Sequence, residues 1–238
     1  MLQTIILILA ALVSSIISGT MGMGGGIILL AVMAAFFPPL VLIPLHGIVQ
    51  FASNLTRTLL SYDSIVWSIT LPFAIASLPA AYLASRLVIE IPQSTFKVFL
   101  GFFILLMTWM PKLKNAPKIK GKFFILGFVA TFISLFIGAT GPFLAPFYLR
   151  EGLVKEKLVA TKAACQLFLH FFKVCAYLQI GFHVQEHASI LFGLIAMVVL
   201  GNAIGKKLLK KISDNSFVLA LKIILSLLAI HIIVKALL

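Results

Sequence analysis

The sequence predicts an all-α fold: a polytopic integral membrane protein of about eight transmembrane helices in two homologous repeats. Three observations support this class. Hydrophobic residues make up 62% of the 238 residues and charged residues only 11%, whereas soluble domains carry about 25% charged residues. Apolar runs recur along nearly the whole chain, and a membrane span needs about 20 apolar residues. The two halves also match at a constant offset, which is typical of secondary transporters.

The expected helices follow in order as apolar runs, separated by segments that contain glycine, proline or lysine. The runs lie at about 2–20, 26–37, 41–61, 64–86, 93–110, 122–137, 142–149, 157–180, 187–205 and 216–237. Segment 111–122 carries five lysines, and we expect it to be a basic linker on the cytoplasmic side of the membrane. It separates a first membrane repeat, 1–110, from a second, 123–238.

A shift of 116 residues aligns glycine and polar positions of the two halves. The matched pairs include Ser18 with Ser134, Gly22 with Gly138, Gly25 with Gly141, Gln50 with Gln166 and, as a basic pair, Arg57 with Lys173. After a five-residue insertion near 178–188 the shift becomes 121, which pairs Ser68 with Ser189. We therefore predict that each half is one copy of a unit of about 110 residues.

The first apolar stretch of each repeat is interrupted. As one helix, residues 2–37 would be about 54 Å long, which exceeds a single span. The run breaks at Gly22–Gly26, and its counterpart breaks at Gly138–Pro142. Each opening is either one crossing or a re-entrant hairpin of two half-helices. Single crossings leave 8 and 10 Lys and Arg residues on the two sides, whereas re-entrant hairpins give inverted repeats with 14 and 4. The positive-inside rule favours the second arrangement, with the 14-residue side in the cytoplasm.

The two interruptions are the first candidate binding elements. Irregular backbone at membrane depth is tolerated where it lines a cavity or is buried in protein, and a helix that starts there presents free N–H groups to an anion. The candidate residues at the breaks are Gly22, Gly24, Gly25, Gly26, Gly138, Thr140 and Gly141. The alternative is close helix packing by small residues, but the presence of a break in both halves favours binding.

The next run of each repeat carries a polar stripe, which is the second candidate. His46, Gln50, Asn54 and Arg57 share one helical face, and the shift of 116 places Lys162, Gln166, His170 and Lys173 in the matching positions. Polar residues within a span usually face the bundle interior and often mark a pathway, although they also serve as hydrogen bonds between helices. The predicted pathway residues are Gln50, Asn54, Arg57, Gln166, His170 and Lys173.

The positions of the charged residues restrict the class of substrate. All six acids fall in loops or at the ends of runs: Asp63, Glu90, Glu151, Glu156, Glu186 and Asp214. A cation path or a carboxylate proton relay normally needs an acid within the membrane, so we expect an anion substrate, for which export could be a uniport. The net charge of +13 comes from 19 Lys and Arg against 6 Asp and Glu. These basic residues lie mostly in short loops, so they indicate membrane topology rather than nucleic-acid binding.

We expect no cofactor, no resident metal and no catalytic residue. His183 and His187 have the spacing of a metal pair, but they lie in a short loop without a convincing third ligand. Cys165 and Cys175 are interpreted as small packing residues. The sequence does not indicate an oligomeric state.

The segment Ser18–Gly26, a proline-containing turn and a span with Gln50 and Asn54 resemble the sulfite exporter TauE/SafE family, as does the weaker second copy around Gly138 and Gly141. The resemblance covers nearly the whole chain. It implies a multi-pass permease of the inner membrane, with about eight helices, for small sulfur-containing anions such as sulfite, sulfonates or thiosulfate. Its motifs identify the family well but identify the substrate poorly.

Besides a non-transporting assembly partner, two other readings compete with a sulfur-anion transporter. One is a membrane transporter for another solute class, such as an amino acid or a metal ion, which a substrate panel would separate. The other is a membrane-embedded enzyme, which usually has clustered acids or a nucleophile with its base. The sequence shows neither arrangement, so we expect no enzymatic activity.

Overall fold

The computed structural model describes residues 2–22, 24–87, 93–109, 121–153 and 155–209, and single positions between 223 and 237. Its helices are α1 (Leu2–Met21), α2 (Gly25–Met33), α3 (Pro39–Leu60), α4 (Trp67–Ser85), α5 (Gln93–Trp109), α6 (Lys122–Ile137), α7 (Gly141–Arg150), α8 (Lys155–Gln179) and α9 (Ala188–Leu208), with 3-10 helices η1 (Tyr62–Ser64) and η2 (Val184–His187). These ranges contain no strand. Most of the expected linker 111–122, together with Glu90 and Asp214, lies outside the described residues.

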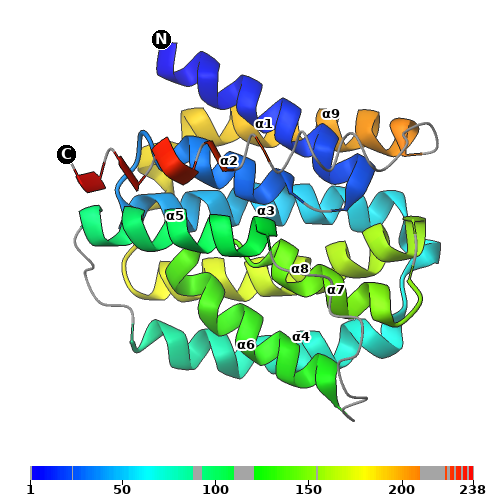
Figure 1. Cartoon of the computed structure of the whole chain (residues 1–238). Coiled ribbons are helices and arrows are strands. Elements are labelled where there is room, and N and C mark those ends of the chain that lie inside the picture. The colour runs from blue at the N-terminus through cyan, green and yellow to red at the C-terminus, as the bar shows by residue number, and fades with distance from the viewer. Residues whose placement is uncertain are drawn as a thin grey trace.

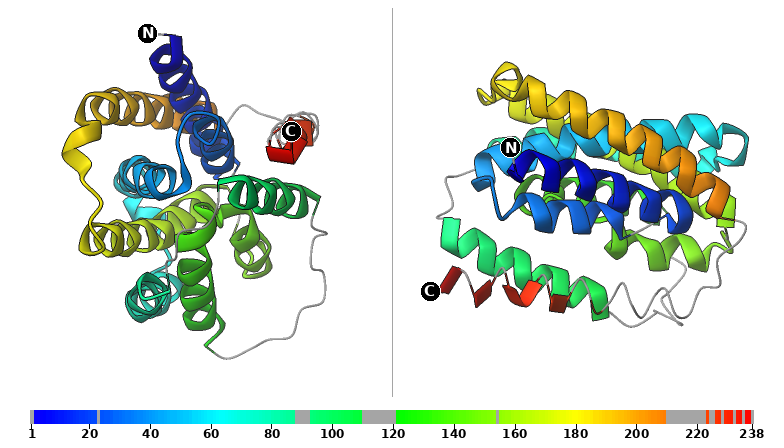
Figure 2. Two further views of the ribbon diagram at one scale, coloured as in Figure 1. Left: turned by 90° about the vertical axis from the view of Figure 1, so that its left-hand side faces the viewer. Right: turned by 90° about the horizontal axis from the view of Figure 1, so that it is seen from above.

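Five of the described helices, α1, α3, α4, α8 and α9, are long and apolar enough to cross a membrane. Helix α6 is apolar but has only 16 residues. The expectation of about eight spans therefore stays a prediction. Most helices run side by side along one direction (Figures 1 and 2), as in a membrane bundle.

The order of elements in the first half recurs in the second. Helix α2 begins at residue 25 and α7 at 141, α3 at 39 and α8 at 155, and α4 at 67 and α9 at 188. These starts differ by 116, 116 and 121 residues, which are the shifts that align the two halves of the sequence. The short helices η1 and η2 precede α4 and α9, respectively.

Each half opens with a helix that breaks at its glycine motif. Gly22 and Gly24 have φ angles of 70° and 90°, and Gly138 has a φ of 93°, a region that favours glycine. Helix α2 then folds back along α1 as a hairpin (Figure 1). A Cβ on Gly25 would lie 1.8 Å from the Ser14 carbonyl oxygen, so the two arms of this hairpin meet closely only because Gly25 has no side chain.

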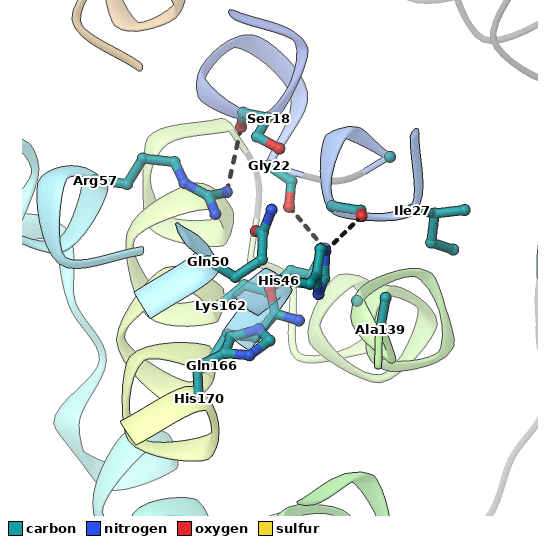
Figure 3. Close-up of a pocket in the computed structure, with 13 residues that line it drawn as sticks. Ser18, Gly22, Ile27, His46, Gln50, Arg57, Ala139, Lys162, Gln166 and His170 are labelled. Atoms are coloured by element: carbon teal, nitrogen blue, oxygen red, sulfur yellow. Dashed lines mark hydrogen bonds between the residues drawn. The ribbon is translucent and has the colours of Figure 1, made fainter. Parts of the chain in front are cut away.

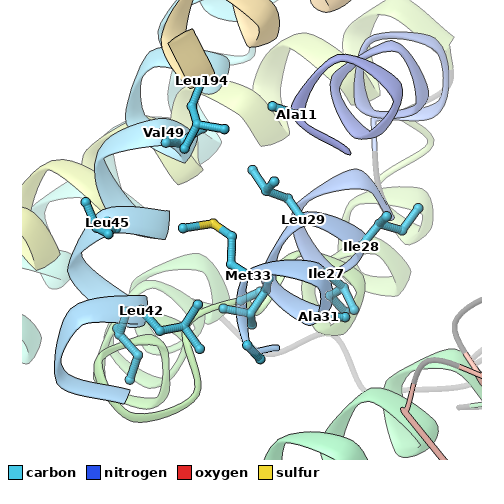
Figure 4. Close-up of a cluster of buried hydrophobic side chains, with 14 of the residues drawn as sticks. Ala11, Ile27, Ile28, Leu29, Ala31, Met33, Leu42, Leu45, Val49 and Leu194 are labelled. Carbon is cyan, nitrogen blue, oxygen red and sulfur yellow. The ribbon is translucent and has the colours of Figure 1, made fainter. Parts of the chain in front are cut away.

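The apolar core surrounds the short helix α2. With nine residues, α2 spans about 13.5 Å, too little to cross a membrane. Its Leu29, Leu30 and Met33 are fully buried, and this core also includes Leu42 and Leu194 (Figure 4). A helix that is apolar all round is stable when it is buried. The core therefore fixes α2, and with it the glycine turn at the start of α2.

Helices α3 and α8 cross the centre of the bundle antiparallel. Phe51 contacts Phe171 with ring centroids 6.0 Å apart, and Ser61 Oγ lies 3.4 Å from a Glu156 carboxylate oxygen. Residue numbers rise on α3 as they fall on α8. Because α3 and α8 occupy equivalent places in the two halves, equivalent helices run in opposite directions.

The outer helices pair across the halves. Ser15 Oγ on α1 lies 3.3 Å from the Met197 carbonyl oxygen on α9, and Thr20 Oγ1 lies 3.3 Å from the Gly205 carbonyl oxygen. On the other side of the bundle, Thr131 on α6 donates to Ser77 on α4 at 2.9 Å. The opening helix of each half thus packs against the fourth helix of the other half. The two halves are interlocked in space.

Candidate functional site

A small cavity of about 20 Å³ lies where the two glycine breaks meet α3 and α8. Thirteen residues line it: Ser18, Gly22, Gly24, Gly26, Ile27, His46, Gln50, Arg57, Ala139, Gly141, Lys162, Gln166 and His170. Two separate predictions from the sequence, the breaks and the polar stripes, therefore meet at one place. About 10–15 Å³ by this measure is enough to hold one water molecule, so in this conformation the cavity has room for about one water.

The polar side chains of the cavity come from facing helices. His46, Gln50 and Arg57 project from α3, and Lys162, Gln166 and His170 project from α8, so that the two stripes oppose one another (Figure 3). Residues at spacings of three and four share a helix face. Since α3 and α8 are antiparallel, each stripe presents its polar face to the other along the same length of helix.

The glutamines lie directly against the glycine turns. A Cβ on Gly26 would lie 3.3 Å from Gln50 Oε1, and a Cβ on Gly141 would lie 3.2 Å from Gln166 Nε2. These are tighter than ordinary van der Waals contacts. Glycine at both places therefore lets a side-chain amide approach the start of a helix, once in each half.

Three basic side chains are buried around the breaks. Arg57 is 4% exposed, Lys162 is 1% exposed and Lys173 is fully buried. Lys162 donates to the Gly22 carbonyl at 2.6 Å, and Lys173 donates to the Gly138 carbonyl at 2.8 Å. Each lysine therefore holds the backbone of one glycine break.

Arg57 is held by neutral acceptors. It donates to Asn54 Oδ1 at 2.7 Å and approaches the carbonyls of Ser18 and Ser53 at 3.4 Å. The buried polar side chains of the described part of the chain include no aspartate or glutamate. The two ion pairs that the structure describes, Lys122–Glu151 and Lys206–Glu156, lie toward the surface. The region around the breaks is thus rich in buried basic groups that carboxylates do not neutralise.

The predicted site residues divide into two groups. Those lining the cavity are Gly22, Gly24, Gly26, Gln50, Arg57, Gly141, Gln166 and His170. Those outside its lining are Gly25, Asn54, Gly138, Thr140 and Lys173. Gly25 allows close packing on α1, Asn54 orients Arg57, and Gly138 accepts a hydrogen bond from Lys173. The Thr140 hydroxyl is buried and has no hydrogen-bond partner among the described residues.

The predicted set omits Ser18, Ile27, His46, Ala139 and Lys162, which also line the cavity. His46 and Lys162 are the first members of the two stripes, so their spacing alone could have identified them. Ser18, Ile27 and Ala139 flank the glycines, and their types give no signal. Within the described residues, no group of three or more His, Cys, Asp or Glu side chains could hold a metal ion.

A protein-family model matches nearly the whole chain. The family model described as "Sulfite exporter TauE/SafE" matches residues 7–232. The chain belongs to the sulfite exporter TauE/SafE family. The match covers both halves and confirms the resemblance seen in the sequence. No curated protein and no solved structure gives a significant match.

Membership of the TauE/SafE family, together with the apolar helices, makes this chain a multi-pass membrane protein of a transporter family. The cavity between the glycine breaks has a largely polar lining. It offers amides from Gln50 and Gln166, basic groups from Arg57 and Lys162, and the first turns of α2 and α7. The first N–H groups of a helix have no partner within that helix.

Proposed function

We propose that this TauE/SafE protein is a secondary transporter of a small sulfur-containing anion, such as sulfite or an organosulfonate, in the inner membrane. The observation that carries the proposal is the set of buried basic residues Arg57, Lys162 and Lys173 in a region whose described buried side chains include no acid. An unpaired charge in a protein interior is costly, by several kcal/mol per ion even after relaxation (about 3–5 kcal/mol when one partner is removed). An anion in the cavity supplies the missing charge.

The binding mode follows from the lining. Gly24 and Gly26 at the start of α2 and Gly141 at the start of α7 bring two helix N-termini to the cavity. Helix N-termini stabilise anions through free N–H groups and the helix dipole. In the proposed complex Gln50 and Gln166 donate hydrogen bonds to the anion, while Arg57 and Lys162 supply positive charge.

The arrangement of the halves suggests how the anion crosses. Helices α3 and α8 are equivalent in sequence and antiparallel in space, which supports inverted repeats with the site between them. Transporters of this design expose a central site to each side of the membrane in turn. A cavity of about 20 Å³ corresponds in this scheme to a closed conformation, and a sulfur oxyanion requires α2 or α7 to move away from the stripes.

The test uses purified protein in liposomes and records charge movement after jumps of sulfite, thiosulfate, sulfoacetate, sulfate and chloride. We expect a saturable response to one or more sulfur anions. Arg57→Gln and Lys162→Gln should each reduce it by about tenfold or more, because a hydrogen bond to a charged group contributes about 1.5–3 kcal/mol.

The controls are Arg86→Gln and Lys206→Gln, which remove basic residues that lie away from the cavity. Both should behave like the parent protein. Labelled-anion counterflow in the same liposomes detects electroneutral exchange. If neither assay responds to any of the anions, or if Arg57→Gln and Lys162→Gln both transport normally, the proposed site is wrong.

A further inference from the structure

Two histidines face each other in the cavity. His46 on α3 and His170 on α8 have ring centroids 6.2 Å apart and an interplanar angle of 77°. The side chains are 0% and 2% exposed, and both line the cavity (Figure 3). They are not equivalent by the repeat, because the shift of 116 places His46 on Lys162 and Asn54 on His170. The internal repeat therefore does not account for the pair.

The hydrogen bonding of His46 fixes where its proton lies. Its Nε2 is 2.8 Å from the Gly26 carbonyl oxygen, and a carbonyl can only accept, so Nε2 carries the hydrogen. In a neutral imidazole the other nitrogen is then an acceptor. His46 Nδ1 is buried and has no hydrogen-bond partner among the described residues, and the same holds for His170 Nδ1. His46 thus keeps a buried lone pair with no donor.

The charged side chains around the two rings are basic. Lys173 of α8 acts electrostatically on both rings, and Arg57 of α3 acts on His170. Lys162 of α8 lines the same cavity. From the glycine breaks, the groups that face His46 are the backbone carbonyls of Gly26 and Gly138, and the buried side chains described around them include no carboxylate.

In these surroundings, the stability of a positive charge on either ring depends on whether an anion is bound. An imidazolium on either ring is repelled by Lys173, and one on His170 also by Arg57, in a medium of low dielectric constant. An anion in the cavity attracts an imidazolium and so offsets this repulsion. A group that is uncharged before binding and stabilised as a cation after binding takes up a proton when the anion arrives.

We propose that the His46–His170 pair is a proton-binding site, with His46 Nδ1 as the acceptor, so that the anion binds together with a proton. The inference rests on the proposed function. The coupling is reciprocal: if anion binding raises the affinity for the proton, the proton raises the affinity for the anion by the same factor. The proton comes from the solvent and binds the lone pair of His46 Nδ1, so no group is displaced, and it returns to the solvent when the anion leaves.

Titration calorimetry tests the proposal directly. Purified parent protein in detergent is titrated at neutral pH with thiosulfate, sulfate and methanesulfonate, anions that do not themselves take up protons there. Each titration is run in Tris and in imidazole buffer, which have different heats of ionisation. Sulfonate buffers are avoided because they are candidate ligands. Proton uptake makes the observed heat depend on the buffer, and we expect about one proton per bound anion.

His46→Gln identifies the acceptor. Its amide can still donate to the Gly26 carbonyl, but it has no nitrogen that titrates near neutral pH. We expect this variant to bind the anion more weakly and with the same heat in both buffers. The matched control is His183→Gln, an exposed histidine outside the cavity, which should keep the parent's proton uptake. His170→Gln serves as a second variant of the pair if His46→Gln does not fold.

The outcomes separate this inference from the proposed function. Equal heats in the two buffers for an anion that binds the parent protein would overturn the proton site and leave the anion site intact. Full proton uptake in both His46→Gln and His170→Gln would overturn the assignment to the pair. If none of the three anions or sulfite raises the melting temperature or gives a binding heat, the proposed function fails, and the proton site fails with it.

Discussion

The two glycine breaks interrupt equivalent places of the two halves but have different surroundings. In the first, Gly22, Gly24 and Gly26 all line the cavity, and Arg57 lies beside them in the lining. In the second, Gly141 lines the cavity, whereas Gly138 receives the hydrogen bond of Lys173. Arg57 and Lys173 are equivalent by the shift of 116, yet only Arg57 reaches the cavity.

The difference comes from the acceptors that each basic group finds. Lys173 donates to the Gly138 carbonyl and to Ser134 Oγ, at 2.8 and 3.2 Å, so protein acceptors already engage two of its three N–H groups. Arg57 has five donors in a planar fork, and its bonds to Ser18 and Ser53 are long, at 3.4 Å. Both halves thus break their opening helix at glycine, while we expect ligand binding to depend mainly on the first break.

The largest difference between the two breaks is expected when the equivalent glycines Gly25 and Gly141 are replaced by alanine. In Gly25→Ala the Cβ would lie 1.8 Å from the Ser14 carbonyl oxygen, a backbone atom that moves only if α1 moves. Overpacking typically costs about 1–3 kcal/mol, and we expect this contact to exceed that range and to remove most of the folded protein. Gly141→Ala meets only flexible side-chain ends, Gln166 Nε2 at 3.2 Å and Lys162 Nζ at 3.5 Å.

Gly141→Ala should therefore fold and lose transport, because the methyl group reaches into the cavity. Size-exclusion profiles and thermal melts in detergent measure the first effect, and anion flux in liposomes measures the second. Similar behaviour of the two variants, whether both fold or both collapse, would contradict the contrast between a packing glycine and a site glycine.

The next largest effect is expected on anion affinity when Lys162 or Lys173 is replaced by glutamine. Lys162→Gln removes a basic group that lines the cavity, and we expect anion affinity to fall by about tenfold or more. Lys173→Gln removes one that does not line it, so its effect on affinity should be clearly smaller. Isothermal titration with the transported anion measures both. An equal loss in the two variants would show that Lys173 belongs to the site in another conformation.

The glutamines should behave alike, since both lie in the cavity against a glycine turn. Gln50→Leu and Gln166→Leu each remove one neutral hydrogen bond to the anion, which contributes about 1 kcal/mol, or roughly fivefold in Kd. Gln179→Leu, at an exposed end of α8, is the control and should change Kd little. A loss confined to Gln50→Leu would extend the asymmetry between the halves to the amides.

Thr140 provides the smallest effect. Its hydroxyl is buried without a hydrogen-bond partner among the described residues, and such a group destabilises the fold by about 1–3 kcal/mol. Thr140→Val keeps the shape and removes the hydroxyl, so the melting temperature should rise by a few degrees with little change in transport. If flux falls instead while the melt is unchanged, the Thr140 hydroxyl belongs to the ligand site.

The sequence predicts the positions of the site better than its connections. Glycine at 22–26 and 138–141 and the spacing of the stripes place eight of the thirteen predicted residues in the cavity lining. That Lys162 of the second half holds the Gly22 carbonyl of the first requires the packing of the halves, which local periodicity does not contain. Likewise, an apolar run such as 26–37 does not reveal whether it contacts lipid or protein, and the structure buries α2 in the core.

The pairing of α1 with α9 has a consequence for biosynthesis. Helix α1 ends at residue 21, and α9 begins at residue 188. The small, polar face of α1 that contacts Gly201 and Gly205 of α9 is therefore made long before its partner leaves the ribosome. Neither half can be completed as a separate module, and the first helix of the chain reaches its final packing only after α9 has been inserted.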